Sequence, residues 1–125
     1  MILVDTSVWI EHFRVGEPRL ATLLRNGQVL THPWVTGELA LGRLSRRSEI
    51  LGLLNNLPGA NTATGGEVLE LVEQRHLVGL GIGYVDAHLL AATLLTAGAG
   101  LWTRDKRLAS IASGLGLLAP GDQEA

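Results

Sequence analysis

The apolar run Ile2-Leu3-Val4, followed by Asp5, places the strongest constraint on how this chain can fold. Three apolar residues in succession, without alternation, are typical of a strand that is buried on both faces, and such a strand lies in the middle of a sheet. Asp5 ends the strand, and Thr6 and Ser7 can cap the helix that follows. The sequence therefore predicts a carboxylate and two hydroxyls at the carboxyl end of a central strand, where open α/β sheets bind their ligands.

Strand and helix patterns alternate along the rest of the chain. Short apolar runs predict further strands at 29–30, 101–102 and 115–118, with a weaker one inside the polar stretch 61–66. Longer segments with helical spacing predict helices at 8–13, 18–26, 33–42, 50–57, 67–77, 84–97 and 106–113. This alternation predicts an α/β fold with a mostly parallel sheet.

The composition indicates one globular domain. The chain has 125 residues, of which 46% are hydrophobic, and that is enough to bury a core. Its net charge is only −2, so any surface that binds nucleic acid must be a local one. No cysteine is present, which excludes disulfides and thiolate metal sites. The chain starts with no signal-peptide pattern, and the run 89–102 is too short to cross a membrane, so we expect a cytoplasmic protein without membrane contact.

The aspartates are informative because the chain has only four and three of them stand at junctions between elements. Asp5 and Asp105 each follow an apolar strand, and Asp86 stands in the first turn of a predicted helix. Glu38 lies among mostly apolar helix neighbours, so its carboxylate needs a partner. Structural explanations stay open for all four: Asp5 and Asp105 as helix caps, Asp86 as an anion favoured by the helix dipole, and Glu38 as a side chain that reaches the rim.

Several carboxylates in one pocket have a chemical consequence. At about 5 Å and an effective dielectric constant of about 20, each like-charged pair costs about 3 kcal/mol. Protonation or a divalent cation relieves that cost. Carboxylate, hydroxyl and water oxygens are hard ligands, which suit Mg²⁺ or Mn²⁺ and disfavour zinc. A cation held in this way polarises a phosphate and activates water for attack.

Four motifs of the chain resemble those of one family. They are Val4-Asp5-Thr6-Ser7 after the first strand, Glu38 within a helix, the helix start Gly83-Tyr84-Val85-Asp86-Ala87, and the turn Thr103-Arg104-Asp105. In this order they resemble the motifs of the PIN-domain ribonucleases, from Ile2 to about Leu118. The chain length and motif spacing are most similar to the VapC toxins of bacterial toxin–antitoxin pairs.

The resemblance implies a PIN-like three-layer α/β/α fold with a central, mostly parallel sheet of four to five strands, formed by residues 1–120, with a flexible tail at 121–125. It implies a metal-dependent endoribonuclease that uses Mg²⁺ or Mn²⁺, cuts an RNA substrate, forms a homodimer and is silenced by an antitoxin protein. The implied site consists of metal-binding acids at Asp5, Glu38, Asp86 and Asp105, the last being the more variable one, and of orienting hydroxyls at Thr6, Ser7 and Thr103.

Two other functions remain possible from the residues alone. A phosphotransfer enzyme with an aspartate nucleophile usually pairs it as Asp-x-Asp, but Ser7 occupies the second position here. A non-catalytic receiver-like regulatory domain needs paired acids and a late lysine, but the only lysine, Lys106, directly follows Asp105. Only the nuclease should cleave RNA in a reaction that EDTA abolishes.

The remaining chemistry-bearing residues are predicted to have mainly structural roles. The histidines show no metal-ligand spacing, although His88 lies close enough in sequence to Asp86 to support it. The three tryptophans, Trp9, Trp34 and Trp102, are predicted to be core residues first and base-stacking platforms second.

Two surface features point toward partners. The basic residues Arg104, Lys106 and Arg107 flank Asp105 and are the better placed of the basic groups to meet RNA phosphates; Arg43, Arg46 and Arg47 form the other group. The leucines at 20–24 and 50–57 either complete the core or line a groove or dimer face.

Overall fold

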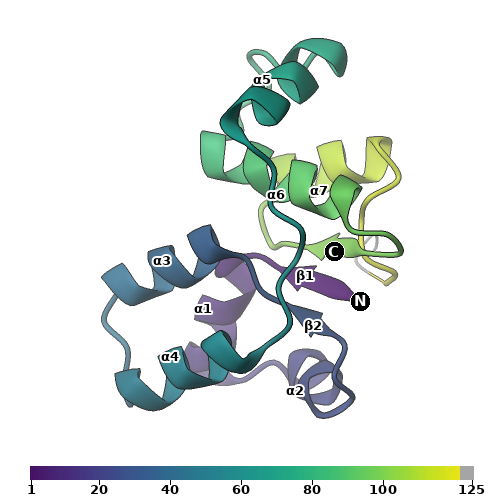
Figure 1. Ribbon diagram of the computed structural model, residues 1–125. Coiled ribbons are helices and arrows are strands. Elements are labelled where there is room, and N and C mark those ends of the chain that lie inside the picture. The colour runs from purple at the N-terminus through teal and green to yellow at the C-terminus, as the bar shows by residue number, and fades with distance from the viewer. Residues whose placement is uncertain (122–125) are drawn as a thin grey trace.

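The central strand of the computed structural model, which describes residues 1–121, is the predicted one. Three parallel strands form the sheet in the order β2-β1-β3, with β1 at Ile2–Val4, β2 at Val29–Leu30 and β3 at Gly100–Trp102 (Figure 1). Leu3 of β1 is in register with Leu30 on one side and with Leu101 on the other. All three strands therefore end at the same edge of the sheet. The predicted tail beyond Gly121 lies outside the described residues.

Both edges of the sheet are extended by a single parallel bridge, Thr31 to Gly59 and Leu101 to Leu118. The second bridge lies within the predicted strand 115–118. The first lies just before the predicted weak strand at 61–66, and no strand is found in that stretch of the described chain. There, Thr64 accepts a hydrogen bond from the Glu67 N–H and the Glu67 carboxylate accepts one from the Thr64 N–H, so the polar residues begin a helix.

Seven helices of the described chain cover the two faces of the sheet and confirm the three-layer α/β/α arrangement (Figure 1). One side carries α1 (Thr6–Val15), α2 (Pro18–Arg25), α3 (Pro33–Leu41) and α4 (Arg47–Asn56). The other side carries α5 (Gly65–Gln74), α6 (Tyr84–Leu95) and α7 (Lys106–Gly114), with α5 packed on α6. Every helix predicted from the sequence is present, with shifted ends.

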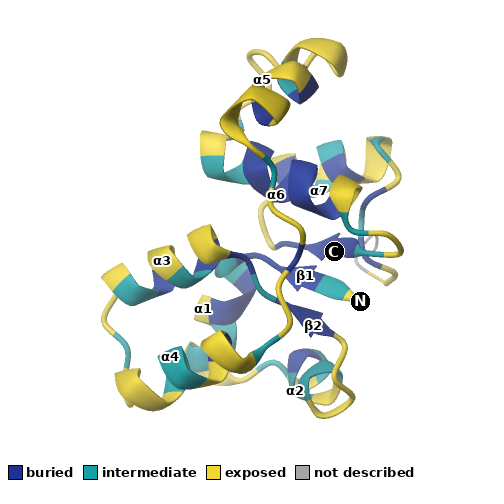
Figure 2. Ribbon diagram, in the orientation of Figure 1, coloured by how far each residue is buried: buried dark blue, intermediate teal, exposed yellow. Residues whose placement is uncertain are grey.

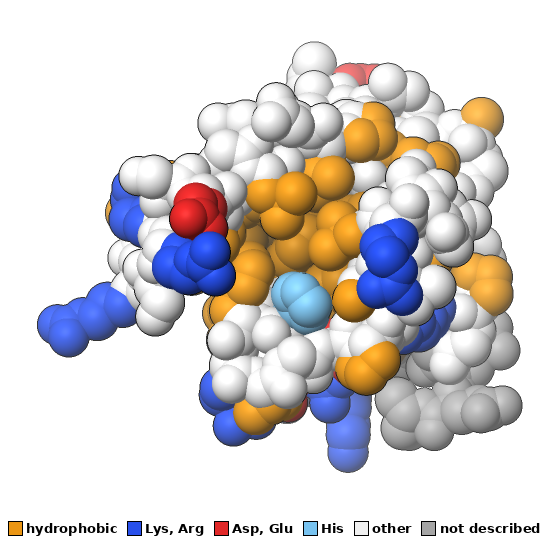
Figure 3. All heavy atoms as spheres, turned by 90° about the horizontal axis from the view of Figure 1, so that it is seen from below, with side chains coloured by type: hydrophobic (Ala, Val, Ile, Leu, Met, Phe, Trp, Pro, Cys, Tyr) orange, Lys and Arg blue, Asp and Glu red, His pale blue; other side chains and the backbone are white. Residues whose placement is uncertain are grey.

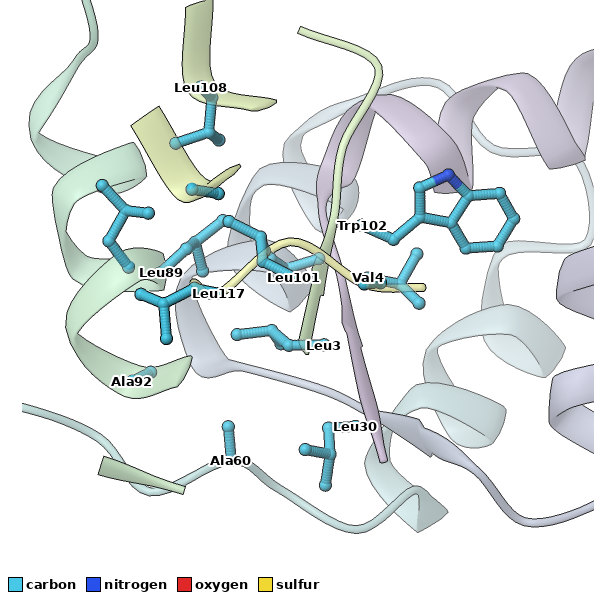
Figure 4. Close-up of a cluster of buried hydrophobic side chains, with 14 of the residues drawn as sticks. Leu3, Val4, Leu30, Ala60, Leu89, Ala92, Leu101, Trp102, Leu108 and Leu117 are labelled. Atoms are coloured by element: carbon cyan, nitrogen blue, oxygen red, sulfur yellow. The ribbon is translucent and has the colours of Figure 1, made fainter. Parts of the chain in front are cut away.

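The core follows from the alternation of side chains along the strands. Leu3 and Leu101 point toward Leu89 of α6, whereas Val4 and Trp102 point to the opposite face (Figure 4). Burying each such large apolar side chain contributes about 1.5–3 kcal/mol to folding. The helix α6 is buried along most of its length, while α5 lies largely exposed on the outside (Figure 2).

No helix in residues 1–121 is both long enough and apolar enough to cross a membrane.

Candidate functional site

The carboxylate of Asp5 is buried at the carboxyl end of β1, where the sequence predicts it, but it does not cap α1. Asp5 occupies the N-cap position of that helix without making a side-chain capping hydrogen bond. Its Oδ2 instead accepts hydrogen bonds from Ser7 Oγ at 2.8 Å and from Thr103 Oγ1 at 2.7 Å. The side chains of two neighbouring strand ends thus hold a carboxylate that is only 6% exposed. The capping interpretation of Asp5 is wrong.

The protons of both hydroxyls are directed at Asp5 by the backbone. Ser7 Oγ accepts a hydrogen bond from the Arg104 N–H at 3.0 Å, and Thr103 Oγ1 accepts one from the Asp105 N–H at 3.1 Å. Each hydroxyl accepts the backbone N–H through an oxygen lone pair and donates its own single proton to the Asp5 carboxylate. The turn after β3 therefore fixes the orientation of the Asp5 carboxylate through two side chains.

Asp105, at the end of β3, is a helix cap. Its Oδ1 accepts hydrogen bonds from the backbone N–H groups of Arg107 at 2.9 Å and Leu108 at 3.1 Å, which satisfies two donors at the start of α7. The carboxylate is exposed, and its other oxygen makes no hydrogen bond within the described chain. Capping and a role in the site are compatible for this residue, because the cap uses only one oxygen.

Glu38 finds its partner on α1. Thr6 Oγ1 donates a hydrogen bond of 2.7 Å to Glu38 Oε1, which joins the start of α1 to the middle of α3. Glu38 is exposed, so its side chain reaches the rim of the helix, which is the structural explanation that the sequence left open. Of the apolar helix neighbours of Glu38, Val35 is buried in the core, whereas Leu41 is 91% exposed.

Asp86 completes the acidic group from the first turn of α6. Its Oδ2 accepts a hydrogen bond of 3.0 Å from the Gly83 N–H. Burial raises the pKa of Asp86 above its ordinary value, the hydrogen bond from Gly83 opposes this, and the negative charges of Asp5, Asp105 and Glu38 raise the pKa further. All four predicted acids therefore interact electrostatically at one edge of the sheet.

The acids interact but do not form a closed metal cage. No group of three or more acidic or histidine side chains in residues 1–121 is close enough to hold a metal ion by direct ligation as it stands. Each acid nevertheless keeps one oxygen without a hydrogen bond from the described chain, while the other oxygen is oriented. Mg²⁺ is usually held by one or two carboxylates and several waters, so this donor set fits such an ion.

Aromatic side chains border the acids where α3 and α6 begin. The ring of Trp34 lies 4.1 Å from that of His88 and 5.6 Å from that of Tyr84, between centroids. Trp34 is 37% exposed, so its prediction as a core residue is wrong, whereas Trp9 and Trp102 are buried as predicted. Nothing in the sequence pattern set Trp34 apart; Tyr84, directly after a glycine-rich stretch and two residues before Asp86, offered the only signal.

Two buried histidines pack behind these aromatic residues. His32 Nδ1 accepts a hydrogen bond of 3.1 Å from the Trp34 N–H and so caps α3. Burial lowers the pKa of His88, and burial together with the nearby His88 lowers the pKa of His32. Both imidazoles are therefore neutral near pH 7.

An apolar groove of about 580 Å³ lies between α1, α3 and α4 and reaches Glu38. On the face seen in Figure 3, apolar side chains gather in a hollow between lysine and arginine side chains. The sequence left open whether the leucines at 20–24 and 50–57 lie in the core or in a groove. Leu20 and Leu54 are fully buried, whereas Leu53 is exposed. The groove is lined by Ile10, Phe13, Leu39, Leu44 and Ile50 and by the charged residues Arg14, Glu38, Arg43 and Arg46.

The basic residues on either side of Asp105 are held to different degrees. The Arg104 guanidinium lies 3.6 Å from the Glu17 carboxylate, and Lys106 is exposed. Arg107 lies against Gly81, which has a φ of +82°; a side chain at position 81 would collide with the guanidinium. Because the exposed Arg107 side chain can move aside, it is the left-handed backbone conformation at position 81 that favours glycine there.

A parallel sheet between helical layers, with four acids at its carboxyl edge, defines the class of this protein. Residues 2–114 match the PIN domain family, and the chain therefore belongs to the PIN-domain family. The chain is 54% identical over 108 residues to "Ribonuclease VapC32" of Mycobacterium tuberculosis strain CDC 1551 / Oshkosh, covering 86% of this chain and 87% of that protein. The same values hold for "Ribonuclease VapC32" of strain ATCC 25618 / H37Rv. The resemblance to the VapC type is thereby confirmed.

Proposed function

We propose that this protein is a metal-dependent endoribonuclease and the toxin of a toxin–antitoxin pair. The observation that carries the proposal is the Asp5 carboxylate, which is held by two hydroxyls at the sheet edge and interacts electrostatically with Asp86. The relatives carry the name ribonuclease, which supports the same reaction. The reaction is hydrolysis of a phosphodiester bond of RNA, and we place it in the cytoplasm, where RNA is available.

The proposed cofactor is Mg²⁺, with Mn²⁺ as a substitute. Asp5, Glu38, Asp86 and Asp105 would hold it through the carboxylate oxygens that accept no hydrogen bond from the described chain, one or two of them directly and the others through bound water. A bound divalent cation lowers the pKa of water and stabilises the charge that develops on the phosphate. Hydrogen bonds within the protein orient all four acids: Ser7 and Thr103 fix Asp5, Thr6 fixes Glu38, Gly83 fixes Asp86, and the first backbone N–H groups of α7 fix Asp105.

The structure supports the nuclease over the two alternatives. A phosphotransfer enzyme would have a second acid at position 7, but Ser7 donates a hydrogen bond to Asp5 there. A receiver-like domain would use a lysine beside the acids, but Lys106 is an exposed residue in the first turn of α7. Membership of the PIN-domain family favours the same conclusion.

The antitoxin is the second proposed partner, and the groove that reaches Glu38 is its proposed binding site. Apolar walls flanked by Arg14, Arg43 and Arg46 suit an amphipathic segment that carries acidic residues. A segment seated in the groove would end beside Glu38 and block the site. We also propose a homodimer, for which the exposed apolar residues of α5 and α6, such as Leu69, Leu94 and Leu95, are available.

RNA cleavage by the purified protein tests the enzyme. We expect cleavage in millimolar Mg²⁺ or Mn²⁺, abolition by EDTA, and loss in Asp5→Asn. Glu73→Gln, which removes an exposed carboxylate of α5, is the matched control and should cleave normally. The metal should also raise the thermal midpoint, because it binds only the native state. Cleavage that persists in EDTA would contradict the proposed metal dependence.

Expression in a bacterial host tests the toxin. The wild type should arrest growth, co-expression of the antitoxin should relieve the arrest, and Asp5→Asn should be harmless at equal abundance. Harmless expression of soluble wild-type protein that cleaves RNA in vitro would leave the enzyme intact and refute the toxin.

A further inference from the structure

Two half-exposed aromatic side chains stand beside the acids. We propose that Trp34 and Tyr84 form a stacking surface that holds one nucleobase of a single-stranded RNA next to the bond that is cut. This inference rests on the proposed ribonuclease function and names the part of the substrate that the site would recognise.

Both rings lie near the start of a helix that also carries one of the acids. Trp34 lies one helical turn before Glu38 on α3, and Tyr84 lies two residues before Asp86 on α6. Their ring centroids are 5.6 Å apart and the ring planes meet at 65°. Both helices begin at the carboxyl edge of the sheet, so the aromatic pair and the acids lie at the same edge.

Exposure distinguishes this pair from the other two tryptophans. Trp34 and Tyr84 are 37% and 48% exposed, whereas Trp9 is fully buried and Trp102 is 6% exposed. The Tyr84 hydroxyl makes no hydrogen bond within the described part of the chain. Apolar ring surface beside a strongly polar site is therefore available to a ligand.

The rings are held in place from behind. His88 is buried, with its ring 4.1 Å from Trp34 at an interplanar angle of 31° and 4.6 Å from Tyr84 at 84°. The Trp34 backbone is fixed by its hydrogen bond to His32 Nδ1. A surface that is already ordered loses less conformational entropy when a ligand binds.

The charges on either side of the acids point to a nucleic acid as the occupant. The order β2-β1-β3 places Asp5 between the end of β3 and the end of β2. After β3, Arg104 precedes α7, and Lys106 and Arg107 lie in its first turn; after β2, Trp34 lies in the first turn of α3. A strand of RNA that crosses the acids would meet positive charge on one side and aromatic rings on the other. Aromatic rings stack on any base, and only an unpaired strand can offer one.

Two substitutions of Trp34 separate stacking from packing. Trp34→Leu keeps apolar contact with His88 but removes the aromatic face, and Trp34→Phe keeps an aromatic face. With a short single-stranded RNA as substrate and Mg²⁺ present, Trp34→Leu should raise KM at least about fivefold with a smaller change in kcat. Trp34→Phe should stay within about twofold of wild type. Equal KM values for all three proteins would overturn the proposal.

Abasic substrates test the same contact from the RNA side. In an Asp5→Asn background, which leaves the strand uncut, removing the base at one position of the RNA should weaken binding about fivefold or more. The same removal should have no effect when Trp34→Leu is added. Trp34 is the only exposed tryptophan of the three, so the intact strand should also quench tryptophan fluorescence. Additive losses from the two changes would overturn the stacking contact.

The two proposals fail in distinguishable ways. Absence of cleavage by the wild type would refute the ribonuclease, whereas normal cleavage with unchanged KM in Trp34→Leu would refute only the stacking surface. A loss of antitoxin binding without a change in KM would assign the rings to the partner protein and overturn the proposal. If Trp34→Leu does not fold, Tyr84→Leu compared with Tyr84→Phe provides the same test, with the same expected order of KM values.

Discussion

The β1–α1 and β3–α7 junctions look alike in sequence, since each has an apolar strand, an aspartate and then a helix, yet they use the aspartate differently. At β3–α7, Asp105 accepts two backbone N–H groups of its own helix and is exposed. At β1–α1, Asp5 occupies the same N-cap position, makes no capping hydrogen bond and is buried. Its carboxylate receives the hydroxyls of Ser7 and Thr103 instead.

The difference teaches that tertiary partners, and not the local pattern, decide what such an aspartate does. Thr103 belongs to the other junction, so β3–α7 supplies the group that draws Asp5 away from capping. The first turn of α1 is consequently left without a side-chain cap, which forgoes about 1 kcal/mol of helix stability. A polar site that gives up local stability is the pattern expected where function sets the geometry.

The largest difference between the two junctions should appear in RNA cleavage when the aspartate of each is substituted. Asp5→Asn keeps the size of the side chain and an oxygen that can accept both hydroxyls, but it removes the charge. We expect kcat/KM for RNA to fall about a thousandfold with little change in thermal midpoint. Initial rates with a fluorogenic RNA measure this, and a rate within about tenfold of wild type would remove Asp5 from the catalytic centre.

Sequence reasoning reached the architecture because the hydrophobic periodicity determines which faces are buried. The central strand at Ile2–Val4, the seven helices and the shared sheet edge of Asp5 and Asp105 followed from it, whereas the complete set of four acids followed from the family resemblance. It could not separate Asp5 from Asp105, because the hydroxyl that distinguishes them is 98 residues from Asp5 in the chain. Trp34 was misjudged for a related reason: an apolar residue on a helix lies in the core only when another element covers it fully, and the Trp34 side chain is left 37% exposed.

A smaller effect is expected from Thr103→Val, which severs the link between the two junctions. The substitution keeps the shape of a buried side chain but leaves Asp5 without one donor and the Asp105 N–H without its acceptor. We expect a loss of about 1–3 kcal/mol in the free energy of unfolding, together with a clear loss of cleavage. Urea unfolding monitored by circular dichroism measures the first quantity.

Thr103→Ser is the control for this link, because serine keeps the hydroxyl. It should retain most of the cleavage and lose less stability than Thr103→Val. Equal behaviour of the two variants would show that the methyl group, and not the hydroxyl, is what matters at position 103.

At the β3–α7 junction we expect a stability effect that β1–α1 lacks. Asp105→Ala removes the cap of α7 and should lower the free energy of unfolding by about 1 kcal/mol, while Asp105→Asn should preserve most of it. Both variants should lose cleavage to a similar, modest extent, about tenfold. Thermal unfolding of the pair decides the matter: equal midpoints would mean that the observed capping bonds do not stabilise the helix.

The smallest effect should appear in the pKa of Asp86, which the charges of both Asp5 and Asp105 raise. Burial is the main reason that the pKa of Asp86 is raised above 3.8, and the charge of Asp5 contributes more than that of Asp105. Asp5→Asn should therefore lower the pKa of Asp86 more than Asp105→Asn does. Carbon-13 NMR of labelled aspartate in the metal-free protein measures both shifts, and Glu73→Gln should leave the pKa of Asp86 unchanged.

The same raised pKa predicts how stability depends on pH. A carboxyl group whose pKa is raised in the folded state binds its proton more tightly there than in the unfolded chain. Its contribution to stability is complete below the unfolded pKa and is lost as the pH rises through the folded pKa. In the metal-free protein, Asp86→Asn should remove this decline in the free energy of unfolding with rising pH. Asp5→Asn should make the decline smaller than in the wild type, and by more than Asp105→Asn does. The opposite order would mean that Asp86 lies closer to the β3–α7 junction in solution than the structure places it.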